Sequence, residues 1–400
     1  MLVGVRAWEI AKGPPHAGVH YPRDASQLHE WFRTEHAARE YLTAVRFQEG
    51  VSCPRCRGQV GAPKGDRWWC PPCRRWFTVT TGTLLERTKV PLRIWIEVAW
   101  HLIDTKVGVS ATSVAQLTGL DYRSAWGLLH KLRRAMDQNG RERLHGEVEF
   151  DETYVGGVEE GAGGRSRGKK QPVAVACERV SDTRMGRIRL ARLPDASALA
   201  IADFFEHHVE PGSVLVSDNW ASYTPALDEL AKRGLTYQHR PTSLRATGER
   251  AHRIHPHVHR VAALLKRWIL GTHQGSITGE YLDAYLDEFV FRFNRRHSKN
   301  RGLVFWRLVC ALVNTDPFPR AELVRRPGEL DTADRQHTEQ VEAWRRAQRA
   351  ALKRDRRRRG AEARAHRPPL PAQRRPGGRR TRVGPDPTSC GCVVIARALS

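Results

Sequence analysis

The stretch that most constrains the fold of this chain is 147–154, where two acidic residues interrupt a strand-like pattern. Val148 and Phe150 alternate with polar neighbours, which is the two-residue period of a strand with one buried face. Asp151 and Glu152 fall in the middle of this strand, where a carboxylate is costly to bury unless a partner offsets its desolvation. The stretch therefore indicates a metal site or an active site, or alternatively an edge strand whose acids face solvent.

The charge of the chain favours a polyanionic partner. Its 400 residues carry a formal net charge of +24, and residues 341–382 hold sixteen Arg and Lys against three acids. Setting aside the net +13 of that segment leaves +11 on the rest, so the basic character is not confined to one end. Such a distribution points to nucleic acid, with an anionic membrane surface as the alternative.

Targeting signals are absent from the sequence as printed. The N-terminus lacks the apolar segment of a signal peptide, and no run approaches the roughly 20 apolar residues that a membrane span needs. Four of the eight cysteines form CxxC pairs, which in this context indicate metal ligation rather than disulfides. We expect a cytoplasmic protein without membrane association.

Two CxxC pairs separated by thirteen residues form the strongest metal motif. The pairs are Cys53-x-x-Cys56 and Cys70-x-x-Cys73. Four thiolates at this spacing can converge tetrahedrally on one ion, and Zn²⁺ is the usual occupant of such a closed structural site. Four neighbouring aromatic residues are expected to supply apolar cover: Trp68, Trp69, Trp76 and Phe77. The spacing leaves open whether this metal-binding segment contacts DNA or whether the metal only stabilises its fold.

Two helices joined by a tight turn at Gly119 follow, with Ser110 and Asp121 as expected N-caps. The second helix has a basic polar face, which is typical of a helix-turn-helix whose second helix enters the major groove. The alternative is an ordinary helical hairpin, and the net charge favours DNA. The residues expected to contact DNA are Arg123, Lys131 and Arg134.

The next segment predicts three successive strands and then alternating helices and strands. The fourth strand, Val214–Asp218, ends in a carboxylate. This order is that of the ribonuclease-H-like α/β fold, a mixed sheet flanked by helices. In that fold Asp151 and Asp218 project toward a common point, where two carboxylates can bind Mg²⁺ or Mn²⁺. Asp218 could alternatively cap the following helix. The Gly- and Arg-rich loop 156–171 between the first two strands is suited to phosphate contact.

Several motifs in order along residues 30–300 carry a family resemblance. They are the two CxxC pairs, Phe77-Thr-Val-x-x-Gly82-Thr, Phe150-Asp-Glu-Thr-Tyr-Val-Gly-Gly157, Ser217-Asp-Asn-Trp-x-x-Tyr223, Leu265-Lys-Arg-Trp-x-x-Gly-Thr-His273 and Tyr285-Leu-Asp-Glu-Phe-x-Phe-Arg-Phe-Asn-Arg-Arg296. With them the chain resembles bacterial insertion-sequence transposases that have an N-terminal zinc ribbon and a DDE-type catalytic domain. The resemblance implies that Asp151 and Asp218 begin the catalytic acidic triad.

The third member of the triad departs from the family pattern. The family places an acid seven residues before a basic residue on the same helix face, and seven before Lys266 stands His259. An imidazole can bind a divalent ion, although it suits Mn²⁺ better than Mg²⁺. We expect His259 to be the third ligand and Lys266 to contact a DNA phosphate. The alternatives for the third ligand are Glu249, other histidines of the cluster and, less favoured, two acids of the next helix: His252, His255, His257, Asp287 and Glu288.

The sequence thus divides into a zinc ribbon (30–85), a helical DNA-binding segment (86–140), a catalytic domain (141–315) and a basic disordered tail (316–400). A last apolar helix at 303–313 is expected to pack on the catalytic domain. The tail could clamp DNA without regard to sequence or be an extension without function.

The resemblance implies a transposase that binds the terminal inverted repeats of its own element and performs metal-dependent cleavage and strand transfer. It also implies a homo-oligomer on double-stranded DNA, near the bacterial nucleoid. One alternative, motivated by the missing third carboxylate, is an inactive DNA-binding protein derived from a transposase. A zinc-ribbon transcription factor leaves the Asp151 and Asp218 pair unexplained.

Overall fold

The structure, a computed structural model, describes residues 14–137, 141–156, 170–218, 220–242, 251–275, 277, 279–324 and 329–365. Glu249, most of loop 156–171 and the last 35 residues lie outside this part. The chain divides into two compact units, residues 1–342 and 343–400. No described helix is long and apolar enough to cross a membrane.

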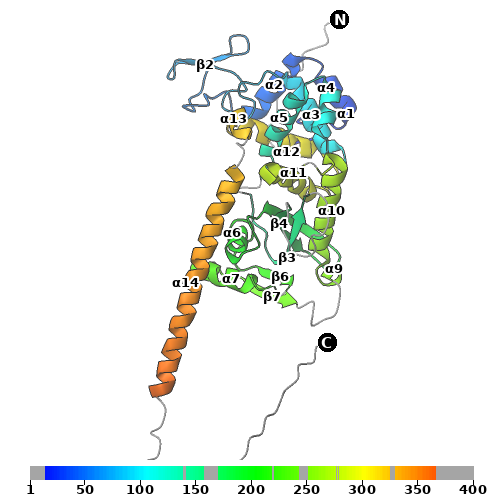
Figure 1. Cartoon of the computed structure of the whole chain (residues 1–400). Helices are drawn as coiled ribbons and strands as arrows, with labels where there is room; N and C mark the ends of the chain where they lie inside the picture. The colour runs from blue at the N-terminus through cyan, green and yellow to red at the C-terminus, as the bar shows by residue number, and fades with distance from the viewer. Residues whose placement is uncertain are drawn as a thin grey trace, which may run out of the picture. The chain divides into compact units, whose positions relative to one another are not determined.

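The N-terminal part of the first unit is helical, with one small hairpin inserted (Figure 1). Its elements are α1 (Ala25–Trp31), α2 (Glu35–Arg46), β1 (Trp68–Cys70), β2 (Arg75–Phe77), α3 (Leu92–Asp104), α4 (Ala111–Thr118) and α5 (Tyr122–Arg134). The predicted caps are confirmed, because the side chains of Ser110 and Asp121 accept hydrogen bonds from the backbone N–H groups three residues on. Gly119 ends α4 with φ of 70°, a left-handed conformation that favours glycine.

A five-stranded mixed sheet forms the second half of this unit. Its strands are β3 (Glu147–Val155), β4 (Gln171–Arg179), β5 (Met185–Arg192), β6 (Val214–Asp218) and β7 (Gln238–Thr242). The spatial order is β5-β4-β3-β6-β7, in which β3, β4 and β5 are antiparallel neighbours and β6 and β7 run parallel to β3. This topology confirms the predicted ribonuclease-H-like fold.

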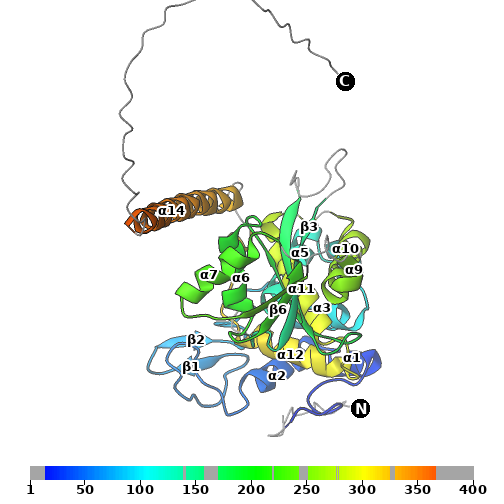
Figure 2. The same cartoon turned by 90° about the horizontal axis from the view of Figure 1, so that it is seen from below.

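Helices cover both faces of the sheet (Figure 2). They are α6 (Ala198–His208), α7 (Tyr223–Lys232), α9 (Ala251–Ile254), α10 (Pro256–His273), the short 3-10 helix η1 (Gly279–Tyr281) and α11 (Leu282–Asn294). Phe150 of β3 packs on Phe204 and Phe205 of α6, with ring centroids 5.4 and 4.6 Å away. On the opposite face, β4 and β5 share an apolar cluster with α10 and α11. Both sheet faces are therefore closed by helices.

The apolar helix predicted at 303–313 is α12 (Arg301–Asn314), but it does not pack where we expected. It joins the N-terminal core, mainly against α2 and α3, instead of the five-stranded sheet. The expectation failed because it rested on proximity in the sequence, whereas the apolar face of α12 packs on helices far earlier in the chain. A buried ion pair also joins the two halves of this unit, since Arg133 of α5 donates to Glu288 of α11 at 2.9 Å.

The prediction of disorder over 316–400 is wrong for two segments, α13 (Arg320–Leu323) and α14 (Glu329–Ala365). The start of α14 is held to the first unit, because Asp334 pairs with Arg192 at 3.1 Å. Residues 329–359 contain neither glycine nor proline and are rich in Ala, Arg, Glu and Gln, which are good helix formers. Net charge alone was therefore a poor guide to order here.

His130 makes the stability of the first unit dependent on pH. It is 2% exposed, and burial, followed by Arg133 and His273, lowers its pKa to about 2. Because the unfolded chain takes up this proton near pH 6.5, the free energy of unfolding should fall below that pH by up to about 1.4 kcal/mol per unit. His130→Phe should make this fall shallower, as measured by urea unfolding at pH 7, 6 and 5. Replacing the exposed His29 by Gln should leave the slope unchanged, and equal slopes for wild type and His130→Phe would contradict this account.

Candidate active site

Strand β3 separates its two acidic residues onto opposite faces of the sheet. The hydroxyl of Tyr223 in α7 donates to Glu152 at 3.1 Å, so Glu152 lies on the α6 and α7 face with Phe150. Asp151 lies on the other face, where His259 of α10 is 3.8 Å away. The strand alternation thus places Asp151, and not Glu152, opposite α10.

Strand pairing places Asp218 level with Asp151 on the adjacent strand, although the ligand atoms of Asp151, Asp218 and His259 do not all lie within 4.8 Å of one another. In the parallel pair β3–β6, Glu149 stands opposite Val216, and the two aspartates come two residues later on each strand. The buried hydroxyl of Tyr223 lies near all the acids involved. Its pKa is raised well above the usual value, first by burial and then by the charges of Glu152, Asp151 and Asp218.

Glu149 fixes the start of α10. Its side chain is fully buried, and one carboxylate oxygen accepts hydrogen bonds from the backbone N–H groups of His257 (2.9 Å) and Val258 (3.2 Å). The N-cap residue His255 provides no side-chain hydrogen bond, and Pro256 has no N–H. The carboxylate therefore satisfies donors that a helix start leaves open, and burial raises its pKa.

His259 and Lys266 share one face of α10 and line a cavity of about 580 Å³. Asp151 and Lys170 line the same cavity. The pKa of Lys266 is lowered, mainly by partial burial and secondly by the positive charge of Lys170. The negative charge of Asp151 opposes this shift. The cavity thus has an Asp–His pair at one part of its wall and two ammonium groups at another.

The neighbouring histidines have different surroundings. His257 is buried, and its Nε2 lies 2.8 Å from the carbonyl oxygen of Ser181, so it serves the packing of α10. His255 is also buried, and within the described residues neither ring nitrogen has a hydrogen-bond partner. Burial, followed by His259, lowers its pKa, and the charge of Asp218 opposes that shift. Among the alternatives to His259 as third ligand, Glu288 forms a buried ion pair with Arg133, so its carboxylate is already engaged away from Asp151.

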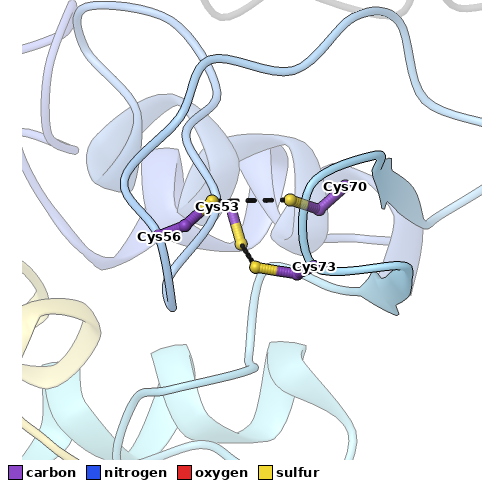
Figure 3. Close-up of side chains that lie close together, drawn as sticks. All are labelled: Cys53, Cys56, Cys70 and Cys73. Carbon is purple, nitrogen blue, oxygen red and sulfur yellow. Dashed lines mark hydrogen bonds between the residues drawn. The ribbon is translucent and has the colours of Figure 1, made fainter.

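The four cysteines converge as their spacing predicts (Figure 3). Their sulfur atoms all lie within 4.8 Å of one another, with 3.9 Å between Cys53 and Cys73 and 3.6 Å between Cys56 and Cys70. The neighbouring Cys56 thiol, followed by burial, raises the pKa of Cys73 to about 12. Such a cluster could hold a metal ion. Among the described residues it is also the one group whose candidate ligand atoms are gathered this closely.

The apolar cover of this cluster is thinner than the sequence suggested. Trp68 and Phe77 are buried and stacked, with centroids 5.8 Å apart. Trp69 and Trp76 point outward and are 41% and 46% exposed, which corrects the expectation for this pair. The hairpin alternation explains the difference, because each strand offers only one residue in two to the core.

The residues expected to contact DNA from α5 differ in accessibility. Arg123 is exposed in the first turn of the helix. Lys131 is half-buried and donates to the carbonyl oxygen of Leu84 at 2.9 Å, so the expectation of a DNA contact is not supported for it. Arg134 pairs with Asp137 at 2.6 Å. Most of α5 beyond its first turn packs into the core, which leaves its N-terminal end as the accessible part.

Sequence reasoning missed two residues of the site, Glu149 and Lys170. Glu149 stands two residues before Asp151 and so on the same strand face, which was a usable signal. Lys170 was included only as part of the loop 156–171. Its place in the cavity depends on where that loop rejoins β4, which residue order does not reveal.

Comparisons with known proteins find similarity to transposases over the segment that contains this site. Residues 143–294, which include Asp151, Asp218 and His259, match the family model of the ISXO2-like transposase domain. An uncharacterized protein in transposable element ISH50 of Halobacterium salinarum (strain ATCC 700922 / JCM 11081 / NRC-1) is 28% identical over 287 residues. That alignment covers 65% of this chain and 91% of the relative.

Solved structures with some similarity come from integrases and transposases. The catalytic core domain of BIV integrase is 19% identical, with 36% of this chain and 80% of that chain covered and a TM-score of 0.22. The Mos1 Strand Transfer Complex is 16% identical, with 57% of this chain and 77% of that chain covered and a TM-score of 0.23. A simian T-cell lymphotropic virus intasome in complex with PP2A regulatory subunit B56 gamma is 11% identical, with 55% of this chain and 75% of that chain covered and a TM-score of 0.28. TM-scores this low carry no argument, so the fold assignment rests on the sheet topology.

Loss of the Glu149 carboxylate should loosen the start of α10. Glu149→Ala leaves two buried N–H groups without their charged acceptor, which should lower the free energy of unfolding by about 2–4 kcal/mol. Glu149→Gln keeps a carbonyl oxygen and should lose less. Urea unfolding measures the loss, and hydrogen exchange of the amides of residues 257–258 locates it. Unchanged exchange in Glu149→Ala would show that the cap does not hold this helix.

Proposed function

We propose that this chain, whose residues 143–294 match the model of the ISXO2-like transposase domain, is an insertion-sequence transposase that cuts and joins DNA strands at the ends of its element. The observation that carries the proposal is the meeting of Asp151 on β3 with His259 on α10, 3.8 Å apart at a cavity that also holds two lysines. Asp218 stands at the same level of the adjacent parallel strand.

Asp151, Asp218 and His259 would hold a divalent cation, Mg²⁺ or Mn²⁺. Two ligands each about 2.1 Å from one ion lie between about 3 and 4 Å apart, which fits the distance between Asp151 and His259. A bound ion of this class activates water and stabilises charge on phosphate oxygens during in-line displacement. The imidazole in the donor set favours Mn²⁺ over Mg²⁺.

The other residues of the site would position the DNA and the metal ligands. Lys266 and Lys170 present ammonium groups at the cavity wall, where they can bind phosphate oxygens of the strand. Glu149 holds the N-terminus of α10 and with it His259. The hydroxyl of Tyr223 donates to Glu152 and so fixes the position of this carboxylate beside the proposed metal ligands.

Recognition of the element ends would fall to the N-terminal part of the chain. Arg123 lies in the exposed first turn of α5, the part of a recognition helix that usually contacts base edges. We assign Zn²⁺ to the cysteine cluster, because four thiolates about 2.3 Å from one ion stand about 3.8 Å apart, close to the sulfur separations of 3.6 and 3.9 Å. Two copies of the chain would act together, since two ends must be brought to one target.

Replacing either aspartate should remove cleavage while retaining DNA binding. Asp151→Asn and Asp218→Asn each remove a charged oxygen ligand and should lower the rate of strand cleavage at least about 10²-fold. A labelled duplex carrying the element end, with Mn²⁺, measures cleavage, and a mobility shift measures binding. Asp228→Asn, which changes an exposed acid of α7, is the matched control and should cleave normally.

The same assay separates the active enzyme from the alternative. Failure of the wild-type protein to cut with either ion, while it still binds the end, would establish an inactive DNA-binding protein. Full cleavage by Asp151→Asn would refute the assignment of β3. His259→Glu should shift the preference from Mn²⁺ toward Mg²⁺, because it replaces the imidazole with a carboxylate.

A further inference from the structure

The outer face of the β1–β2 hairpin carries two exposed indoles side by side. Trp69 and Trp76 are cross-strand partners, with ring centroids 5.4 Å apart and ring planes tilted by 55°. They are 41% and 46% exposed, although the buried pair on the inner face already supplies the core of the hairpin. Two exposed tryptophans on so small a module are not needed for its packing and indicate a contact surface.

The segment that carries this pair is rich in basic side chains, and one of them lies beside Trp76. The guanidinium of Arg67 lies 5.5 Å from the Trp76 ring centroid. Residues 53–77 contain six Arg and Lys and a single acid, Asp66. All six basic side chains are exposed, and none has an ion-pair partner within the described residues: Arg55, Arg57, Lys64, Arg67, Arg74 and Arg75. Positive charge interleaved with exposed aromatic rings is complementary to a nucleic acid strand.

The backbone gives a second, independent observation. Arg57 and Arg74 have φ of 62° and 50°, in the left-handed region, and each directly follows the second cysteine of a CxxC pair. Glycine adopts this conformation without strain, whereas another residue loses about 1 kcal/mol or more there. Two arginines at two equivalent strained positions are unexpected if the ribbon only binds its metal. A contact that uses their charge explains them.

We propose that the tryptophan face, formed by Trp69, Trp76 and Arg67, binds an unpaired DNA strand with the help of Arg57 and Arg74, two exposed arginines of the same small module. Bases stack on the indoles, and the arginines contact the phosphates. An unpaired strand fits better than a duplex, because the faces of paired bases are covered by their neighbours in the stack. That the strand is DNA rests on the proposed function, in which the chain acts on DNA.

Binding of labelled oligonucleotides by the full-length protein tests this proposal. Fluorescence anisotropy compares a 15-nucleotide DNA strand, its RNA equivalent and the corresponding duplex at two salt concentrations. Trp69→Ala and Trp76→Ala should each weaken binding of the DNA strand by about 5- to 150-fold, with duplex affinity changed less than about twofold. Trp69→Phe retains a ring and should lose less.

The outcomes separate this proposal from the proposed function. Undiminished strand binding by both alanine variants, or an equal loss for strand and duplex, overturns the stacking surface. Tighter binding of RNA than of DNA overturns the choice of DNA. Metal content and thermal unfolding of each variant, measured alongside, identify a loss caused by misfolding, in which case Trp69→Phe decides. Cleavage of the element end is read separately, so its absence counts against the transposase reaction and not against the tryptophan face.

Discussion

The bond between a buried carboxylate and a helix start organises the candidate active site. Glu149 lies on the central strand and accepts the backbone N–H groups of His257 and Val258. The same strand carries Asp151 two residues later, and the same helix carries His259 one residue after Val258. Strand and helix are thereby fixed near the point where Asp151 and His259 approach each other. A carboxylate buried this deeply would destabilise the fold if the helix did not occupy that place.

Most of the catalytic fold could be predicted because its signals are local. The alternation at 147–155 and the apolar run before Asp218 determine strands, and the order of elements then selects one topology. The convergence of the four cysteines also follows from spacing alone. Asp151 and Asp218 were found because strand position and family resemblance agreed. Their assignment as metal ligands remains a proposal, and the geometry of β3 and β6 supports it.

What could not be predicted depends on contacts between distant segments. Lys131 looked like a DNA contact on a basic helix face, but the carbonyl of Leu84 engages it. Trp69 and Trp76 looked like core residues until the hairpin register placed them outside. The partner of α12 lies more than 200 residues earlier in the chain, beyond the reach of any local pattern. In each case the sequence indicated the chemical character of the side chains correctly but did not reveal which distant segment, or solvent, they would face.

The central claim is that β3, β6 and α10 together form one metal centre. Anomalous diffraction from crystals of the protein soaked in Mn²⁺ tests it most directly, and the zinc ion proposed for the cysteine cluster serves as a control in the same crystal. The account predicts a manganese peak within coordination distance of Asp151, Asp218 and His259. A clear zinc peak at Cys53, Cys56, Cys70 and Cys73, with no manganese beside the two aspartates, would contradict it.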